Sequence, residues 1–164
     1  MPLPEVPRGT YTMEITGGSC RLGLWYVHVW WSGDEIHSIR FARTGIPGPV
    51  PALVQQYCAG RPVDLSVLST IACEGDTVSA RIYQAVRHVP YGTTITYGGI
   101  AAQVGTSPRA VGRAMARNPT PLVVPCHRVV AAGGIGGFTP TLEIKEYLLN
   151  LEKKGEIKRK STGQ

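Results

Sequence analysis

The chain has 164 residues, of which 43% are hydrophobic and 17% are charged, a balance typical of a folded protein that excludes extended disorder. Seventeen basic residues against eleven acidic ones give a net charge of +6, which favours an anionic partner such as nucleic acid or an acidic membrane surface. The N-terminal residues lack the pattern of a signal peptide, and no apolar run approaches the ~18 residues of a membrane span. We therefore expect a cytoplasmic protein without membrane contact.

The four cysteines are scattered along the chain without a C-x-x-C pair. In a reducing compartment this pattern indicates free thiols rather than a disulfide framework. A structural zinc site is the alternative, but the spacing of its candidate ligands lacks any finger-like pairing. Those candidates are Cys20, His28, Cys58 and Cys73.

The first part of the chain has the alternation and the turn residues of β structure. Residues 10–39 predict a three-stranded antiparallel meander, with turns at Gly17-Gly18 and at 32–34. We expect the aromatic residues of 25–31 to be divided between a small core and the surface, rather than to form a platform for stacking bases. A loop rich in glycine and proline then leads into a short helix that is stopped by Gly60. Turn composition at 72–76 predicts a domain boundary, which separates residues 1–76 from residues 77–164.

After this boundary the period of the apolar residues becomes helical. A helix is predicted from a cap at Asp76 or Thr77 to just before Pro90. A second short helix follows over 97–104, and after a tight turn Ser107 is expected to cap a third helix. Two short helices joined by a brief turn with glycine match the helix-turn-helix motif, whose second helix enters a DNA groove.

The third helix carries arginines at four-residue steps. Arg109, Arg113 and Arg117 therefore share one face, while Ala110 and Gly112 are small enough for close approach to a nucleic-acid backbone. A solvated face on a basic protein is the alternative interpretation. The turn that precedes the helix makes DNA binding the better hypothesis.

A cysteine with an ionisable neighbour lies in the stretch Asn118 to Val130, NPTPLVVPCHRVV. Histidine and arginine beside Cys126 can lower its pKa, and the thiolate is the nucleophilic form. His127 is a candidate base, provided that Pro125 turns the chain, and Glu152 is a candidate to orient it. The alternatives are an inert core cysteine with a solvated glutamate, or a cysteine hydrolase, which the lack of an evident oxyanion loop disfavours.

A glycine-rich loop and a last helix end the chain. We expect residues 131–140 to form a mobile wall beside Cys126 and a helix to run from Thr141 to Gly155. The tail from 156 to 164 is predicted to be disordered. The buried stripe of the helix is expected to consist of Leu142, Tyr147, Leu148 and Leu151.

The string PCHRVV, with NPTPLVV before it and IKEYLLNLE after it, resembles the signature of the O6-alkylguanine-DNA alkyltransferases, also called methylated-DNA–protein-cysteine methyltransferases. The similarity extends upstream through VPYGTTITYGGIAAQVGTSPRAVGRAM and covers roughly Thr77 to Glu152. It implies an α+β fold with a small RNase H-like, antiparallel β-rich N-terminal domain over 1–76. A mostly helical, winged-helix-like C-terminal domain with a helix-turn-helix would follow over 77–164.

The resemblance also implies roles for individual residues. Cys126 would be the alkyl acceptor, His127 the base acting through a water, and Glu152 the carboxylate that polarises the histidine. Asn118 would hold the turn, and Tyr97 would crowd the target nucleotide and donate a hydrogen bond as guanine leaves. The implied DNA contacts are Tyr97, Arg109 as the finger that replaces the flipped base, Ala110, Gly112 and Arg113. The implied pocket consists of Met115, Val129, Phe138 and Thr139.

The implied activity is DNA repair by a single transfer of an alkyl group to Cys126. The substrate would be O6-alkylguanine, and also O4-methylthymine, in double-stranded DNA, with no metal or organic cofactor and with the protein a monomer. Thr139 to Thr141 depart from the usual family pattern, and the turn before Arg109 is shorter than in some members. The competing hypothesis is a non-catalytic lesion-binding or helix-turn-helix protein; lesion-binding relatives lack the acceptor cysteine.

Overall fold

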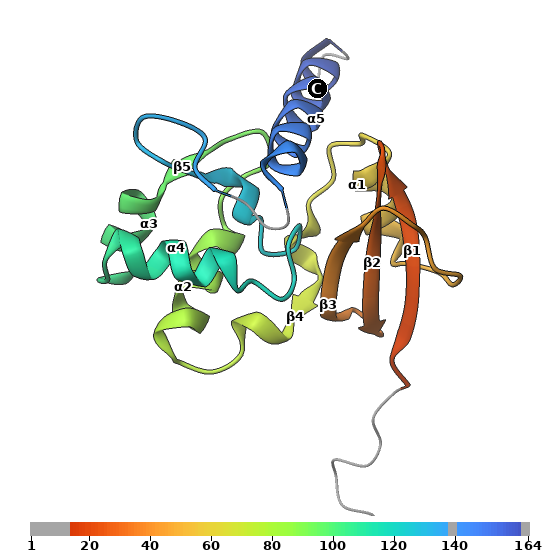
Figure 1. Cartoon of the computed structure of the whole chain (residues 1–164), viewed down its shortest axis with the longest axis horizontal. Helices are drawn as coiled ribbons and strands as arrows, with labels where there is room; N and C mark the ends of the chain where they lie inside the picture. The colour runs from red at the N-terminus through yellow and green to blue at the C-terminus, as the bar shows by residue number, and fades with distance from the viewer. Residues whose placement is uncertain (1–13, 138–140, 162–164) are drawn as a thin grey trace, which may run out of the picture.

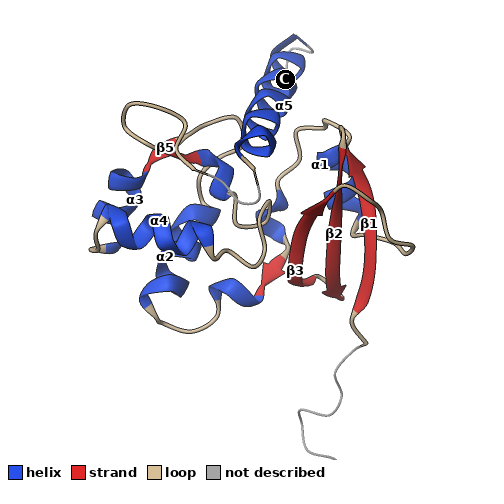
Figure 2. Cartoon of the chain, viewed as in Figure 1, coloured by secondary structure: helices blue, strands red, loops and turns tan. Residues whose placement is uncertain are grey.

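A β-sheet and a group of helices lie on opposite sides of the segment 118–125 (Figures 1 and 2). The computed structural model describes residues 14–137 and 141–161. The sheet contains β1 (Thr16–Leu22), β2 (Trp25–Ser32) and β3 (Glu35–Ala42) as an antiparallel meander, and the short β4 (Ser69–Thr70) pairs parallel with β3. The predicted α+β class and the meander are confirmed.

Alternation along the strands builds the first hydrophobic core. On β2 the side chains of Trp25, Val27 and Val29 are buried, while their neighbours are partly exposed. Helix α1 (Ala52–Cys58) packs against this sheet through Val54 and Tyr57, and Gly60 lies just beyond its end with φ +94°. Burial of these apolar side chains is the main stabilising term for this part of the chain.

The predicted turn at Gly17-Gly18 is wrong, because both glycines lie inside β1 opposite Trp30 and Val29. A Cβ on Gly17 would approach Trp30 Nε1 to 2.9 Å, and one on Gly18 would overlap the Pro49 carbonyl. These glycines therefore permit close packing on the strand. The turn falls instead at Gly23, with φ +59°.

Helices α2, α3 and α4 form the second hydrophobic core. Helix α2 (Val78–Arg87) begins after a Thr77 cap, and α3 (Tyr97–Val104) begins after a Thr96 cap. Gly105, with φ +81°, ends α3, and Ser107 caps α4 (Pro108–Ala116) three residues after α3 ends. The two short helices and brief turn of the predicted helix-turn-helix are thus present.

Helix α5 (Leu142–Ser161) extends beyond the predicted end and projects from the body of the molecule (Figure 1). Gly155 does not end the helix. This glycine is buried, and a Cβ at its position would overlap the Tyr91 hydroxyl, so it permits close packing instead. Residues 156–161, predicted to be disordered, are helical. Leu142, predicted to be buried, is exposed. The buried face of the helix includes Lys145 and Glu152 instead, and both charged groups have hydrogen-bond partners in the interior.

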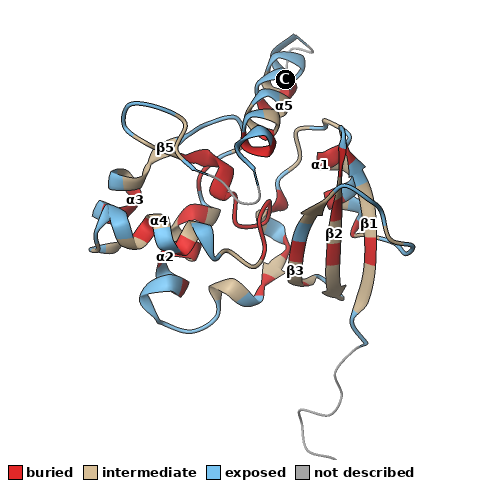
Figure 3. Ribbon diagram, viewed as in Figure 1, coloured by how far each residue is buried: buried red, intermediate tan, exposed pale blue. Residues whose placement is uncertain are grey.

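The segment 118–125 lies between the two cores, and Figure 3 shows how strongly burial is concentrated near it. Leu122 and Val123 pack with the sheet, and Val124 packs with the helices. The backbone N–H of Ile39 donates to the carbonyl of Pro119 at 2.9 Å. The first core also includes residues of α5, so the division at residue 76 stays a prediction. None of the helices in the described part of the chain is long and apolar enough to cross a membrane.

Candidate functional site

Hydrogen bonds of Asn118 hold the loop 118–125 that precedes Cys126. Asn118 Nδ2 donates to the Val124 carbonyl at 2.8 Å, and Asn118 Oδ1 accepts the Thr120 N–H at 3.0 Å. Leu122 in the same loop has φ +77°, an uncommon conformation for a residue with a side chain. Pro125 then precedes the 3-10 helix η3 (Cys126–Arg128). The position of the thiol is therefore set by backbone geometry on both sides.

The thiol faces a cavity of about 950 Å³, within the size range of small-molecule sites. The predicted residues Tyr97, Gly112, Met115 and Asn118 line it together with Cys126. Strand β3 also contributes to its wall, which the sequence did not indicate. Its contribution consists of Ser38, Ile39, Arg40 and Phe41.

The resting thiol is not activated in the way the sequence suggested. Burial raises the pKa of Cys126 to about 11, and the opposing effects of the Asn118 hydrogen bond and the Lys145 charge are smaller. At pH 7 only about one thiol in ten thousand would be ionised. The expectation that its neighbours lower the pKa of Cys126 is therefore wrong, because Arg128 and His127 are both engaged elsewhere. Transfer of the thiol proton requires a base.

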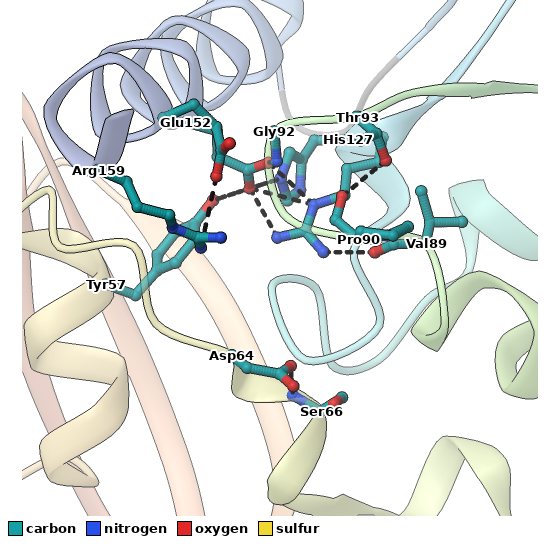
Figure 4. A network of polar contacts seen from close by, with 12 residues as sticks. Tyr57, Asp64, Ser66, Val89, Pro90, Gly92, Thr93, His127, Glu152 and Arg159 are labelled. Atoms are coloured by element: carbon teal, nitrogen blue, oxygen red, sulfur yellow. Dashed lines mark hydrogen bonds and ion pairs between the residues drawn. The ribbon is translucent and has the colours of Figure 1, made fainter. Parts of the chain in front are cut away.

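Glu152 orients the imidazole of His127, the predicted base (Figure 4). Its Nε2 lies 2.5 Å from Glu152 Oε2, and both side chains are buried. The proton is assigned to Nε2, since an unprotonated nitrogen would face an anionic oxygen. Nδ1 then carries the free lone pair, and it is buried without a hydrogen-bond partner among the described residues. Burial lowers the pKa of His127 despite the Glu152 charge, so the imidazole is neutral near pH 7.

Glu152 is an ionised carboxylate held by donors from several segments. Arg128 Nε donates to Oε1 at 2.9 Å and Arg128 Nη2 donates to Oε2 at 2.9 Å. The Gly92 N–H donates to Oε1 at 2.9 Å. Burial alone raises the pKa of Glu152, but His127 and Arg128 outweigh it and hold this pKa well below its usual range.

Two buried polar residues at the site, Tyr57 and Lys145, were not predicted to have a role, and Arg128 was expected to act on Cys126 rather than on Glu152. Tyr57 donates its hydroxyl to Glu152 Oε2 at 2.6 Å, and Arg128 pairs with Glu152 as described. Lys145 donates to the carbonyls of Val129 and Gly137 at 2.7 and 3.1 Å. Spacing in the sequence could have indicated the burial of Lys145. Lys145, Leu148 and Glu152 lie on one face of α5, a face that we expected to be apolar.

The predicted DNA-contact residues lie along α4 and at the start of α3. Arg109, Arg113 and Arg117 are exposed, and Arg117 lies at the cavity. Ala110 is half-buried, and a Cβ added to Gly112 would meet no atom within 4 Å. Tyr97 is half-buried, and burial raises its pKa. The basic face and the entrance to the thiol are therefore adjacent.

The remaining predicted pocket residues are placed differently. Val129 is fully buried, it is not among the lining residues of the cavity, and its carbonyl accepts the Lys145 hydrogen bond. Phe138 and Thr139 lie outside the described residues. Of the four candidate zinc ligands, Cys20 and Cys58 interact with each other, but no group of three or more His, Cys, Asp or Glu in the described part of the chain is placed to hold a metal ion.

Comparison with known proteins matches the region that contains Cys126, His127 and Glu152. The family profile of the 6-O-methylguanine DNA methyltransferase DNA-binding domain matches residues 77–154. A methylated-DNA–protein-cysteine methyltransferase of Methanopyrus kandleri is 47% identical over 100 residues, which are 60% of this chain and 75% of that protein. The chain belongs to the methylated-DNA–protein-cysteine methyltransferase family. The relative of the same name from Metallosphaera sedula is 43% identical, over 60% of this chain and 63% of its own length.

Structural similarity within this methyltransferase family extends into the N-terminal half. The crystal structure of Mycobacterium tuberculosis OGT in complex with DNA superposes with a TM-score of 0.68 at 29% identity, over 84% of this chain and 92% of that one. The family profile, in contrast, begins at residue 77. Tyr57 and the β3 residues of the cavity therefore lie outside the profile, in the half of the chain into which the structural similarity extends.

Replacing Glu152 tests whether its charge is compensated in the interior. Glu152→Gln leaves the Arg128 guanidinium buried without a counter-charge, so we expect a loss of about 3–5 kcal/mol in the free energy of unfolding. Glu156→Gln is the control, since that carboxylate pairs with a half-exposed Arg159 at 3.4 Å and the change should be within about 1 kcal/mol. Urea denaturation measures both. Equal losses in the two variants would contradict the network.

The protonation state of His127 predicts a pH dependence of stability. Its folded pKa lies below its unfolded value, so neutral His127 favours the fold above about pH 6.5, and this contribution is lost as the pH falls. The stability difference between wild type and His127→Gln should therefore shrink between pH 7.5 and pH 5. Denaturation at a series of pH values measures it. A difference that grows on acidification would indicate instead that an ion pair raises the pKa of His127.

Proposed function

We propose that this chain repairs DNA by transferring an alkyl group from O6 of guanine to Sγ of Cys126, once per molecule. The observation that carries the proposal is a buried thiol at the wall of a cavity, followed in the chain by a neutral histidine that a buried carboxylate orients. Neither group needs a metal or an organic cofactor for this reaction. The family membership supports the same activity.

The proposed route to the thiol uses the basic helix α4. An alkylated guanine inside a duplex is out of reach, so it has to be turned out of the stack, at a cost of a few kcal/mol that is smaller for a badly paired lesion. Phosphates would contact the exposed arginines of α4, and Arg109 at the start of the helix would fill the gap left by the base. The flipped base would enter the cavity between Tyr97 and Met115.

The proposed chemistry transfers one proton and one alkyl group. The thiol proton passes through a water to Nδ1 of His127, and the sulfur attacks the alkyl carbon as the carbon–O6 bond breaks. The bonding electrons leave with guanine, which takes a proton from the Tyr97 hydroxyl. The imidazolium of His127 then releases the thiol proton to water and Tyr97 is reprotonated from water, so that one proton passes in total from the thiol to guanine. The products are guanine and a thioether at Cys126, and no ordinary hydrolysis reverses a thioether.

Several finer features belong to the same proposal. We predict that O4-methylthymine is also a substrate and that the protein acts in the cytoplasm as a monomer. The four cysteines are free thiols, which agrees with a reducing compartment. The basic net charge of +6 agrees with a DNA partner.

Label transfer tests the proposed acceptor. Wild type mixed with duplex DNA that contains radiolabelled O6-methylguanine should acquire at most one methyl group per chain, and Cys126→Ser should acquire none. Cys73→Ser is the control, because that half-buried thiol lies outside the cavity and its loss should leave the transfer unchanged. Peptide mass analysis locates the methyl group.

Other outcomes identify the competing functions. Binding to methylated DNA without any mass gain would indicate a lesion sensor or a helix-turn-helix regulator. More than one methyl group transferred per chain would contradict the single-turnover mechanism. Repeated cleavage of a thioester that depends on Cys126 would indicate a hydrolase.

Replacing Arg109 tests base extrusion separately from chemistry. Arg109→Ala should slow repair of O6-methylguanine in duplex DNA by roughly 10-fold or more and leave the reaction with the free methylated base unchanged, because only the duplex substrate requires flipping. Single-turnover rates with both substrates measure the effect. Equal slowing of the two reactions would contradict the proposed role of Arg109.

A further inference from the structure

We propose that Tyr57, from the N-terminal half of the chain, is a positioning residue for the alkyl transfer: its hydroxyl fixes the Glu152 carboxylate and thereby the tautomer of His127. This inference rests on the proposed function, since it assigns a role within that reaction. Tyr57 lies on α1, twenty residues before the region that the family profile matches.

The contact geometry places the Tyr57 hydroxyl between the two members of the catalytic pair. Tyr57 is completely buried, its hydroxyl oxygen lies 2.6 Å from Glu152 Oε2, and the same oxygen lies 3.3 Å from His127 Nε2 (Figure 4). A phenol has a single proton, and here it is donated to the carboxylate. The lone pairs of the hydroxyl are then the groups that face Nε2.

This arrangement favours one tautomer of His127. Nε2 faces the anionic Oε2 at 2.5 Å and a hydroxyl lone pair at 3.3 Å, so both neighbours accept rather than donate. The ring proton therefore resides on Nε2, and Nδ1 keeps the lone pair that the reaction needs. The hydroxyl also disperses part of the negative charge of Oε2, which limits how strongly Glu152 favours the imidazolium.

The other ionisable groups around the pair come from three segments. Arg128 of η3 contacts the carboxylate, and Lys145 of α5 lowers the pKa of His127 through its charge. Tyr91, which follows α2, lies against the Tyr57 ring at 6.0 Å between centroids.

Weaker electrostatic effects come from groups farther from the carboxylate. Glu156 and Arg159 of α5 act on Tyr91, Cys58 acts on Tyr57, and Asp64 lies in the field of Arg128. Among all these groups, only Tyr57 and Arg128 share Glu152 Oε2 with His127. Only Tyr57 does so without a charge.

Tyr91 provides a matched control. Its ring belongs to the same aromatic contact, yet its hydroxyl is buried without a hydrogen-bond partner in the described part of the chain. Tyr91→Phe keeps the ring that lies under Arg128 and removes a hydroxyl that makes no hydrogen bond. A packing effect of losing one phenolic oxygen should therefore be similar in both variants, whereas the effect on Glu152 should be confined to Tyr57→Phe.

The experiment is a series of single-turnover transfer rates across pH with duplex DNA that contains O6-methylguanine. We expect Tyr57→Phe to slow transfer roughly 10-fold near pH 7, as for the loss of one hydrogen bond to a charged group. With one donor fewer, Oε2 holds the imidazolium more strongly, so the acid limb of the rate profile should move to higher pH by up to about one unit. Tyr91→Phe should leave both the rate and the acid limb unchanged.

A double-mutant cycle tests the route of the effect. In a Glu152→Gln background, Tyr57→Phe should change the rate by no more than about twofold, because the carboxylate through which Tyr57 acts is absent. Tyr57→Met also lacks the donor and serves if the phenylalanine variant does not fold. Thermal melting and the final number of methyl groups per chain establish how much of each variant is folded.

The outcomes separate this inference from the function on which it rests. If wild type acquires no methyl group, the proposed function fails. If wild type is methylated but Tyr57→Phe keeps both its rate and its acid limb, the inference alone is overturned. A uniform rate loss at every pH, shared with Tyr91→Phe, would likewise overturn it by indicating a structural role.

Discussion

The buried carboxylate of Glu152 is the interaction on which the rest of the site depends. An isolated anion in a protein interior is strongly unfavourable, and here Arg128, His127, Tyr57 and the Gly92 N–H all donate to it. These donors come from three separate stretches of the chain, and the carboxylate itself comes from a fourth, α5. Completing the charge compensation therefore requires α1, the loop after α2, η3 and α5 to meet, and it holds them in one arrangement.

Burial explains how a protonated thiol and a neutral imidazole coexist beside several cations. Burial raises the proton affinity of Cys126 and lowers that of His127, so neither group is ionised at rest. Because the thiolate is the reactive species, a neutral thiol is protected from stray alkylating agents. In the proposed reaction the proton moves only when a flipped base brings the electrophilic carbon to the sulfur.

The N-terminal half is more than a scaffold for this site. Strand β3 supplies part of the cavity wall, and α1 supplies Tyr57. The backbone bond between Ile39 and Pro119 and the hydroxyl pair of Thr70 and Thr120 attach the sheet to the loop that presents the thiol. A movement of the sheet relative to the helices would therefore shift the position of Cys126, although the stretch Asn118 to Val130 lies entirely in the C-terminal half.

The sequence by itself determined the features that depend on neighbours along the chain. Caps at Thr77 and Ser107, the tight turn at Gly105 and the string around Cys126 are local signals, and they located the helices and the proposed acceptor. Only the tertiary structure decided the direction of the Cys126 pKa, the burial of Lys145 and the contact of Tyr57 with Glu152. Gly17 and Gly155 were misread for the same reason. Burial and partner choice depend on segments far apart in the sequence, whose approach no local spacing encodes.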